Sequence, residues 1–362
     1  ARGTQAAAAQ QSPMNRELVA WVETVTRLTQ PHIIHWCTGS KDEADRIFEL
    51  MLRDGSVEKL DALHHPNSYY VRSDIDDVAR TEDRTFICSL SEDDAGPSNN
   101  WMDPVYMRDL MARQFNGCMQ GRVMYVVPYL LGPPGSPAAR VGVQVTDSPY
   151  VVANLRLVNR IGRVALEHFA DQAGFVKGIH SVGALDPEQR YICHFPEENL
   201  ILSVNTNYGS DAMLPKKCHA LRLASVQARR EGWLAEHMMI LCVTSPDGVR
   251  TFMAGAFPSS CGKTNLAMLM PPDVDLDAGW KVEVVGDDIA WMHFGEDGRL
   301  YAMNPEAGFF GAATGTSYES NPNAMQTLRS NTIFTNVAMT EERSVWWEGL
   351  DGDAPEFCAD WT

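Results

Sequence analysis

One stretch of nine residues constrains the fold more than any other part of the chain. Residues 257–265 read Phe-Pro-Ser-Ser-Cys-Gly-Lys-Thr-Asn, after an apolar stretch (249–256) that favours a strand and before a short helical stretch (265–270). A small-residue loop between a strand and a helix directs backbone N–H groups and the positive end of the helix dipole at one point. This arrangement suits a phosphate group, so the sequence predicts a phosphate-binding loop in an α/β fold.

Within this loop, Lys263 can reach the outer phosphates of a nucleotide and the Thr264 hydroxyl can ligate Mg²⁺. The loop departs from a strict Walker A sequence, because Phe257 stands where the first glycine should be. Gly-Lys-Thr alone is a weak signal and needs support from elsewhere in the chain. The candidate nucleotide-binding residues are Ser260, Cys261, Gly262, Lys263, Thr264, Asn265 and Asp287.

That support comes from residues 281–288. Lys281–Gly286 reads as a second buried strand and leads directly into Asp287 and Asp288. A carboxylate at the end of a strand beside a phosphate loop is the usual second ligand of nucleotide-bound Mg²⁺. Consecutive strand residues point to opposite sides, so the two aspartates can serve two different metals. A solvated turn is the competing interpretation of an Asp-Asp pair, but its position here favours a phosphoryl-transfer site.

Cys261 lies inside the loop, where a helix N-terminus lowers the pKa of a thiol. We include it among the catalytic candidates, although the sequence shows no base near it for covalent catalysis. A reactive bystander is the competing interpretation. Cys193-His194 and Cys218-His219 lack the spacing of a zinc site and read as buried thiols.

The composition limits the choice of partners. The 362 residues carry 30 Lys and Arg against 47 Asp and Glu, a net charge of −17. Such a field repels nucleic acid and anionic membranes, so we expect neither as a partner. No apolar run reaches the roughly 18 residues that a membrane-spanning helix needs. An anionic substrate would require a cationic pocket within this acidic background.

The length and the order of the elements predict an α/β protein with two lobes. Helices and strands are mixed before Gly232, including an expected strand at 150–153 and helices at 155–169 and 218–233. After Gly232 the pattern is strand, strand, phosphate loop, helix, strand. We therefore divide the chain into an N-terminal domain (17–232) and the start of a P-loop domain (233–362). Residues 1–16, rich in Ala and Gln, are expected to be disordered.

Other ionisable residues give less specific indications of a function. Lys216 and Lys217 precede the helix expected from Cys218, where each cation opposes the helix dipole at a cost of roughly 0.3–1 kcal/mol. A pair of lysines in this place suggests a use, with two solvated side chains as the alternative. Taken singly, His237 reads as a hydrogen-bonded structural residue and Arg80 as half of a surface ion pair.

Together these stretches resemble the GTP-dependent family of phosphoenolpyruvate carboxykinases. The phosphate loop is similar to that family's own variant of Walker A, which explains the missing glycine. Further matches are Asp-Ala-Gly-Pro-Ser-Asn-Asn-Trp-Met-Asp-Pro at 94–104, Glu-Gly-Trp-Leu-Ala-Glu-His-Met at 231–238, and residues 146–152, 285–291, 304–306 and 308–311. The similarity extends from about Glu17 to the last residue. It implies an N-terminal substrate-binding domain and a P-loop nucleotide- and metal-binding domain.

The resemblance implies two metal sites. A catalytic Mn²⁺ would be bound by Lys217, His237 and Asp288. The nucleotide's metal, Mg²⁺ or Mn²⁺, would be bound by Thr264 and Asp287. A lysine binds a metal only as the free amine, which requires a dication and a second lysine to depress its pKa. The paired lysines and the lone histidine then share one explanation.

The reaction implied by the resemblance converts oxaloacetate and GTP to phosphoenolpyruvate, GDP and CO₂. Mn²⁺ would act as a Lewis acid, decarboxylation would leave an enolate, and the enolate oxygen would attack the γ-phosphoryl group of GTP. The substrate-binding candidates are Arg80, Tyr208, Gly209, Ser210, Lys216 and Ser259, and the catalytic candidates are Cys261, Lys217 and Arg80. We expect a cytoplasmic monomer, with the mitochondrial matrix left open as a location.

Departures from the family pattern concern the substrate side. The family has Gly-Ser-Gly-Tyr-Gly-Gly-Asn around the tyrosine, whereas this chain has Asn-Thr-Asn-Tyr-Gly-Ser-Asp at 205–211. Lost glycines restrict the approach of backbone to a ligand, and Asp211 adds a negative charge beside the expected anion site. Pro215 replaces a glycine before the lysine pair. We therefore expect these changes to affect substrate affinity more than metal binding.

The family continues well beyond Thr362, and that part would carry the guanine-stacking aromatics, further arginines and an active-site lid. We therefore expect little or no activity from the 362-residue chain alone. A P-loop kinase of a small metabolite would explain the loop and Asp287, but not Lys217 with His237. A third possibility is a metal- and nucleotide-binding fragment without catalysis. The choice of GTP over ATP rests on the resemblance alone.

Overall fold

The computed structural model describes residues 15–78, 81–169, 174–258 and 261–362. Residues 1–14 of the stretch expected to be disordered lie outside the described residues. Helix α1 (Arg16–Thr29) begins directly after them, and the Asn15 side chain caps it by accepting hydrogen bonds from the backbone N–H groups of Glu17 and Leu18. The expectation of disorder is therefore wrong for residues 15 and 16.

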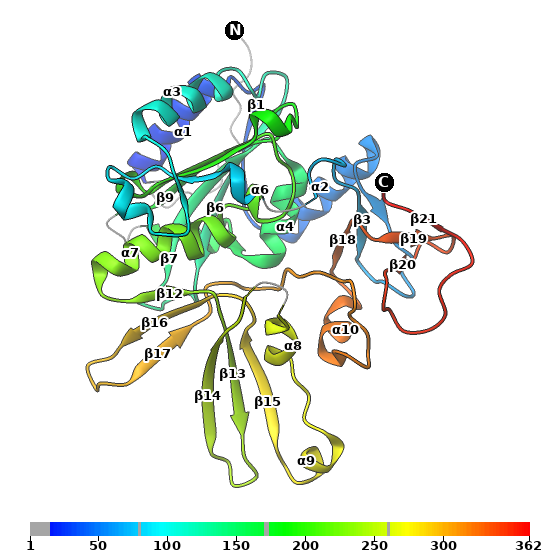
Figure 1. Cartoon of the computed structure of the whole chain (residues 1–362). Coiled ribbons are helices and arrows are strands. Elements are labelled where there is room, and N and C mark those ends of the chain that lie inside the picture. Colours follow the sequence, from blue (N-terminus) through cyan, green and yellow to red (C-terminus); the bar gives the residue numbers. More distant parts are fainter. Residues whose placement is uncertain (1–14, 79–80, 170–173, 259–260) are drawn as a thin grey trace.

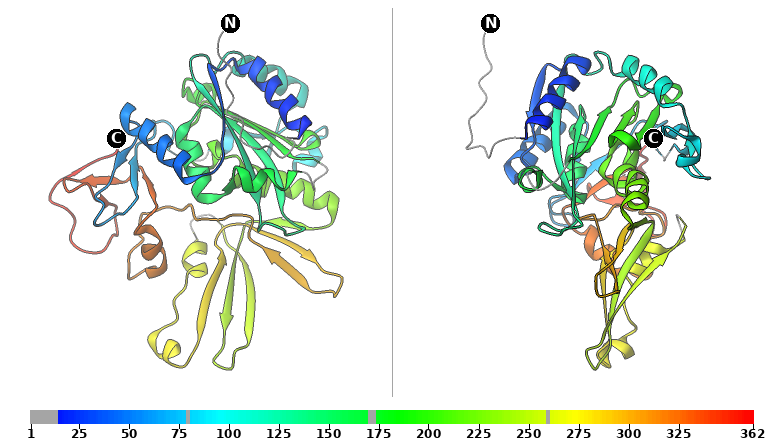
Figure 2. Two further views of the ribbon diagram at one scale, coloured as in Figure 1. Left: turned by 180° about the vertical axis from the view of Figure 1, so that it is seen from behind. Right: turned by 90° about the vertical axis from the view of Figure 1, so that its left-hand side faces the viewer.

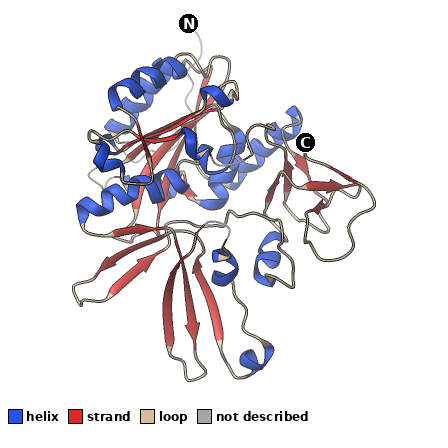
Figure 3. Cartoon of the chain, in the orientation of Figure 1, coloured by secondary structure: helices blue, strands red, loops and turns tan. Residues whose placement is uncertain are grey.

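A nine-stranded mixed sheet forms the centre of the N-terminal region (Figures 1 and 3). Its strand order is β1-β6-β7-β9-β11-β10-β4-β5, with β8 also paired to β6. The strands are β1 (Ile33–Trp36), β4 (Thr85–Ile87), β5 (Asn100–Trp101), β6 (Val123–Leu131), β7 (Arg140–Thr146), β8 (Arg160–Ile161), β9 (Val176–Ser181), β10 (Tyr191–Phe195) and β11 (Leu200–Val204). The predicted α/β class is confirmed.

Helices cover both faces of this sheet, so its central strands are buried on two sides. Alternate residues of β6 point to opposite faces. Val126 belongs to the core with α1 and α3 (Pro104–Phe115), and Val127 belongs to the core with α4 (Pro149–Val158). Both valines are completely buried. This explains why β6 reads as an almost continuous apolar run.

Helix α4 begins earlier than the sequence predicted. The Ser148 hydroxyl accepts a hydrogen bond from the Val151 backbone N–H, and Pro149 occupies the first turn. Ser followed by Pro is a typical helix start, because the serine satisfies a free N–H and the proline lacks one. The expected strand at 150–153 is therefore wrong, and the helix expected at 155–169 is confirmed only over 155–158 in α4 and over 163–166 in a separate short helix.

Two of the small antiparallel sheets after Gly232 lie next to the residues described below. One joins β12 (Leu234–Glu236), β16 (Ala290–Phe294) and β17 (Leu300–Met303). The other, which we call the arm, places β13 (Met238–Thr244) between β14 (Arg250–Ala256) and β15 (Lys281–Gly286), and it projects away from the large sheet (Figures 1 and 2). The predicted strand at 281–286 is correct, but its predicted burial is wrong, because most of β15 is exposed.

The region after Gly232 also forms sheet contacts with the N-terminal region. Strand β18 (Ile333–Thr335) pairs in parallel with β3 (Tyr69–Val71), which pairs with β2 (Glu58–Lys59). The remaining elements are α2 (Lys41–Asp54), α5 (Arg163–Leu166), α6 (Gly209–Ala212), α7 (Ala224–Glu231), α8 (Lys263–Ala267), α9 (Asp273–Asp277), α10 (Pro322–Leu328), β19 (Ala338–Thr340), β20 (Val345–Trp346), β21 (Cys358–Ala359), the 3₁₀ turns η1 (Glu82–Arg84), η2 (Glu92–Ala95), η4 (Pro187–Gln189) and η5 (Pro196–Glu198), and a π-helix, η6 (Pro215–Leu223). None of the described helices combines the length and the hydropathy that crossing a bilayer requires.

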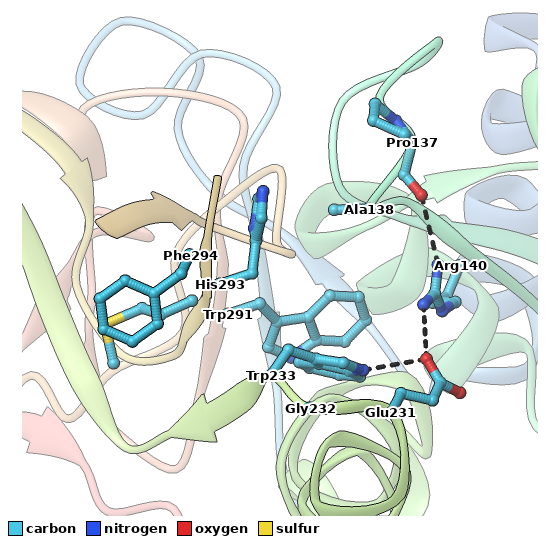
Figure 4. A pocket seen from close by; sticks show the side chains of 10 residues that line it. Pro137, Ala138, Arg140, Glu231, Gly232, Trp233, Trp291, His293 and Phe294 are labelled. Atoms are coloured by element: carbon cyan, nitrogen blue, oxygen red, sulfur yellow. Dashed lines mark hydrogen bonds and ion pairs between the residues drawn. The ribbon is translucent and has the colours of Figure 1, made fainter. Parts of the chain in front are cut away.

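A cluster of side chains at the end of α7 joins the N-terminal region to the region after Gly232 (Figure 4). Glu231 Oε2 accepts hydrogen bonds from Arg140 Nη2 of β7 at 2.8 Å and from Trp233 Nε1 at 2.9 Å. The Trp233 ring packs against Trp291 of β16 with ring centroids 5.2 Å apart. A cavity of about 360 Å³ lies against these side chains. The cluster therefore fixes β12 and β16, which flank the residues described next.

Candidate metal and phosphate site

Asp288 lies at the centre of a cluster of nitrogen groups. Its Oδ1 is 2.6 Å from Lys263 Nζ and 2.8 Å from His237 Nε2. Its Oδ2 is 2.8 Å from Lys217 Nζ and 3.0 Å from Lys216 Nζ. The three residues that the resemblance assigned to the catalytic metal, Lys217, His237 and Asp288, therefore meet at one point.

Separate segments bring these side chains together. His237 stands between β12 and β13, and Asp288 lies shortly after the end of β15. Strands β13 and β15 are neighbours, with an irregularity in register beside Ile240. Adjacent strand ends meet at one edge of a sheet, which places the imidazole beside the carboxylate. Lys216 and Lys217 reach the same edge from η6.

The helix that carries the two lysines is a π-helix at its start. The His219 backbone N–H donates to the Leu214 carbonyl over 2.9 Å, the i to i+5 spacing of that helix type. A wider turn reduces the angle between successive side chains, so Lys216 and Lys217 both face Asp288. Pro215 occupies the first turn, where a missing N–H is tolerated. The helix expected over 218–233 therefore begins at Pro215 and ends at Glu231.

The ionisable groups of the cluster differ in the direction in which their pKa values are shifted. Burial raises the pKa of Asp288, but Lys216, His237 and Lys217 together hold it well below its usual range. Burial lowers the pKa of Lys217, and although Asp288 opposes this, the net value is about 8. Burial also acts on Lys216, but Glu306 and Asp288 outweigh it and raise its pKa. Of the two neighbouring amines, Lys217 thus loses its proton more easily, as a metal-binding lysine must.

The site fits a divalent cation. Lys217 Nζ is buried and makes no well-directed hydrogen bond to any described residue, despite its short distance to Asp288. The Lys263 ammonium lies 2.7 Å from His237 Nε2 and 2.6 Å from Asp288 Oδ1, so a positive charge already bridges the imidazole and the carboxylate. Carboxylates suit Mn²⁺ or Mg²⁺, and imidazole suits transition metals.

The phosphate loop adjoins this cluster. Gly262 has a φ of 85°, in the left-handed region that favours glycine, and it stands at the N-cap of α8. The Thr264 hydroxyl donates to Asp287 Oδ2 over 3.0 Å, which brings together the two residues assigned to the nucleotide's metal. Burial raises the pKa of Asp287. Asn265 Oδ1 accepts a hydrogen bond from Asn321 Nδ2, so its side chain is engaged with the loop before α10.

The substrate-side candidates are only partly described. Tyr208 lines a cavity of about 710 Å³ together with Thr264 and Asp287, so one space joins the tyrosine to the phosphate loop. Gly209 and Ser210 follow Tyr208 in the chain and are buried, and the Ser210 carbonyl accepts a hydrogen bond from Cys218 Sγ. The candidates Arg80, Ser259 and Ser260 lie outside the described residues.

Cys261 occupies a different environment from the other candidates. It is exposed, and its backbone N–H donates to the Pro258 carbonyl. Among the described contacts, none joins its thiol to Asp288 or to the residues around it. No described contact supplies this thiol with a base for covalent catalysis, and the catalytic role of Cys261 stays a prediction.

Glu306 is a member of the cluster to which the sequence analysis gave no role. Its Oε1 accepts a hydrogen bond from Lys216 Nζ over 2.7 Å, and the residue is only 3% exposed. Its backbone N–H donates to Asn304 Oδ1, which fixes the turn that carries it. The stretch Asn304-Pro305-Glu306 was noticed only as part of the resemblance. An acidic residue shortly after strand β17 gives no local sign that it will face a lysine 90 residues away.

Comparison with known families identifies the chain. Residues 20–229 match the phosphoenolpyruvate carboxykinase N-terminal domain, and residues 233–362 match the phosphoenolpyruvate carboxykinase C-terminal P-loop domain. The chain belongs to the phosphoenolpyruvate carboxykinase family. The resemblance drawn from the sequence is therefore confirmed.

Curated relatives in this carboxykinase family are similar over nearly the whole chain. The phosphoenolpyruvate carboxykinase [GTP] of Corynebacterium jeikeium is 50% identical over 359 residues, that of Anaeromyxobacter dehalogenans 49% over 347 residues, and that of Corynebacterium kroppenstedtii 51% over 359 residues. These alignments cover 96% of this chain and 57–58% of the relatives. The chain thus spans somewhat more than half the length of the carboxykinases it matches.

Proposed function

We propose that this chain forms the metal-binding and phosphate-binding part of a GTP-dependent phosphoenolpyruvate carboxykinase. The reaction is the conversion of oxaloacetate and GTP to phosphoenolpyruvate, GDP and CO₂. The observation that carries the proposal is the convergence of Lys217, His237 and Asp288 beside the Thr264–Asp287 pair. The family membership and the relatives named for GTP support it.

In this proposal Lys217, His237 and Asp288 hold Mn²⁺, which when bound supplies a Lewis acid for negative charge on a substrate oxygen. Glu306 and Asp288 keep Lys216 charged at the edge of the same site. The ammonium groups of Lys216 and Lys263, both within 3.0 Å of Asp288, form with the bound dication a cationic spot in a chain of net charge −17. An anionic substrate such as oxaloacetate is attracted to that spot.

On the nucleotide side, Thr264 and Asp287 hold the metal that accompanies GTP, Mg²⁺ or Mn²⁺. Lys263 exchanges its contact with Asp288 for the phosphate oxygens of bound GTP, because one ammonium cannot serve both at full strength. Tyr208 lines the cavity of about 710 Å³ that Thr264 and Asp287 also line, and in this proposal it lies on the oxaloacetate side. The expected substrate contact of Arg80, the monomeric state and the cytoplasmic location stay predictions.

Two measurements test the proposal. Mn²⁺ titration of the 362-residue chain, followed by electron paramagnetic resonance, should show a site that His237→Ala and Asp288→Asn weaken at least tenfold. A chain that binds no Mn²⁺, or whose His237→Ala variant binds it equally well, contradicts the ligand assignment.

The second measurement is CO₂ release from oxaloacetate with and without GTP and Mn²⁺. Release that requires both, with formation of phosphoenolpyruvate, supports a carboxykinase. Phosphoryl transfer from GTP to another metabolite without CO₂ release favours a P-loop kinase instead. Mn²⁺ binding without turnover identifies this chain as the binding part alone.

A further inference from the structure

Two buried carboxylates tie the Tyr208 loop (residues 205–211) to residues 74–78 and to Thr81. Asp77 is 1% exposed and Asp211 is 2% exposed. Neither was a candidate in the sequence analysis, where Asp211 was noticed only as a departure from the family pattern. A buried carboxylate needs hydrogen-bond donors, so its partners show which parts of the chain it holds together.

Asp77 holds the beginning of the loop. Its Oδ1 accepts a hydrogen bond from Thr206 Oγ1 at 2.9 Å, and its Oδ2 accepts one from the Asn207 backbone N–H at 2.5 Å. Arg190 pairs with Asp77 at 3.5 Å and donates both to the Asn205 carbonyl and to the Asp76 carbonyl. This buried arginine therefore joins the same two segments.

Asp211 holds the end of the loop. Its Oδ2 accepts hydrogen bonds from both the backbone N–H and the hydroxyl of Thr81, at 3.1 and 3.0 Å. Its own carbonyl accepts a hydrogen bond from Ser203 Oγ of β11 at 2.6 Å. Thr81 directly follows Arg80 in the chain, and its carbonyl accepts from the Thr85 hydroxyl at the start of β4. Asp211 thus links β11, the Tyr208 loop and the approach to β4.

Asp211 has a different role in the structure from the one expected from the sequence, which was to add a negative charge beside the anion site. In the structure the carboxylate is engaged by Thr81 and does not line the cavity that Tyr208 shares with Thr264 and Asp287. Burial also raises the pKa of the Asp211 carboxyl, although the hydrogen bonds from Thr81 oppose this. The substitution therefore supplies a structural contact.

Asn205 replaces the first glycine of the family run in a similar way. Its φ is 61°, a left-handed conformation that Asn adopts more readily than other side chains do. Its Oδ1 accepts from the Ala184 backbone N–H, and its Nδ2 donates to the Gln189 carbonyl. The backbone shape that a glycine allows is thus retained, and two hydrogen bonds are added.

We propose that Asp211 is a positioning residue for the substrate side of the proposed carboxykinase site. By holding Thr81, it fixes the start of β4 relative to the Tyr208 loop. The inference rests on the proposed function only where it concerns oxaloacetate. The contact between Asp211 and Thr81 is tested separately.

Amide hydrogen exchange in the 362-residue chain tests the contact itself. Asp211→Ala should speed exchange at least tenfold in peptides covering 81–86 and 205–213, because the Thr81 N–H loses its acceptor. Asp211→Asn should exchange like the parent, since an amide oxygen can accept the same two hydrogen bonds. Thr81→Val removes one of them and should give a smaller increase, which keeps the test available if Asp211→Ala fails to fold. Unchanged exchange in both Asp211→Ala and Thr81→Val overturns the inference.

Calorimetric binding of oxaloacetate and of GTP, each with Mn²⁺, tests the consequence for the site. Asp211→Ala should weaken oxaloacetate binding at least fivefold while GTP binding stays within about twofold, and Asp211→Asn should restore oxaloacetate binding. Equal losses for both ligands would mean a general structural role and would overturn the positioning role. If the parent binds no oxaloacetate, the proposed function fails together with that role, whereas the exchange experiment still decides the contact.

Discussion

The nine-stranded sheet and the arm contain strands of similar apolar character, yet they differ in burial. In β6, Val126 and Val127 are both 0% exposed, whereas Val284 and Val285 of β15 are each 38% exposed and Phe252 of β14 is 59% exposed. Helices cover both faces of the large sheet, whereas α8 packs beside only part of the arm. The burial of a strand is therefore decided by the elements that pack on it, and the strand's own sequence does not reveal how buried it will be.

The candidate site lies where these two regions meet. The N-terminal region contributes Lys216 and Lys217 from η6, and the region after Gly232 contributes His237 and Asp288 from the base of the arm. A well-packed region therefore supplies the two adjacent lysines, and a more exposed region supplies the imidazole, the carboxylate and the Lys263 amine. Substitutions in the two regions should consequently have different effects.

Truncation of a core side chain should separate the regions most strongly. Leu130→Ala in β6 removes a fully buried side chain and should lower the free energy of unfolding by about 2–5 kcal/mol. Phe252→Ala in β14 should change it by less than about 0.5 kcal/mol, because the ring is largely exposed. Urea unfolding of both variants measures the difference. Equal losses would show that the arm is packed as tightly as the large sheet.

A second comparison uses two histidines of the region after Gly232. His237→Ala should weaken Mn²⁺ binding at least tenfold, or about 1.4 kcal/mol, because it removes a nitrogen beside Asp288. His293→Ala, an exposed position on β16, should leave Mn²⁺ affinity within about twofold. The two titrations are run side by side. A similar loss in both variants would mean that the effect comes from destabilising the region rather than from a lost ligand.

Acid sensitivity should arise more from the large-sheet region than from the arm. Burial raises the pKa of Glu43, but hydrogen bonds from His35 and from the Thr38 and Gly39 backbone outweigh it and lower the pKa. Such a carboxyl stabilises the fold above its unfolded pKa of about 4.3, and this contribution is lost as the pH falls through the lower folded value. Glu43→Gln should therefore lose less stability than the parent between about pH 5 and 3.

The control for this experiment is Glu283→Gln on β15, whose side chain is 58% exposed. This variant should follow the pH profile of the parent, because an exposed carboxylate gains little from its neighbours. Thermal unfolding across the pH range measures both. A Glu43→Gln profile that parallels that of the parent would show that Glu43 does not contribute to the acid sensitivity.

The smallest effect is expected for Cys261→Ser. Cys261 and Cys358 are the exposed cysteines, whereas Cys193 in the large sheet is buried. A thiol reagent should therefore label two groups quickly in the native chain and one in Cys261→Ser. Mn²⁺ affinity should stay within about twofold, because the thiol makes no described contact with the Asp288 cluster. A large loss of Mn²⁺ affinity would show that Cys261 belongs to the site.

Much of the candidate site was visible in the sequence because its signals are local. The Gly-Lys-Thr loop and the strand at 281–286 were recognised from their order along the chain. The grouping of Lys217, His237 and Asp288 came from the resemblance, since no spacing relates residues from three separate segments. The helix at 149–158 was misplaced because the period of apolar residues was given more weight than the Ser148–Pro149 cap.

The family, the α/β class and the phosphate loop can be recognised from the amino-acid sequence, because short-range order and long matching stretches carry that information. The folded chain was needed to find the contact of Glu306 with Lys216, the contact of Asp211 with Thr81 and the exposure of β15. These features depend on contacts between segments that lie far apart in the sequence. Hydrogen-bond partners and burial exist only once those segments have been brought together.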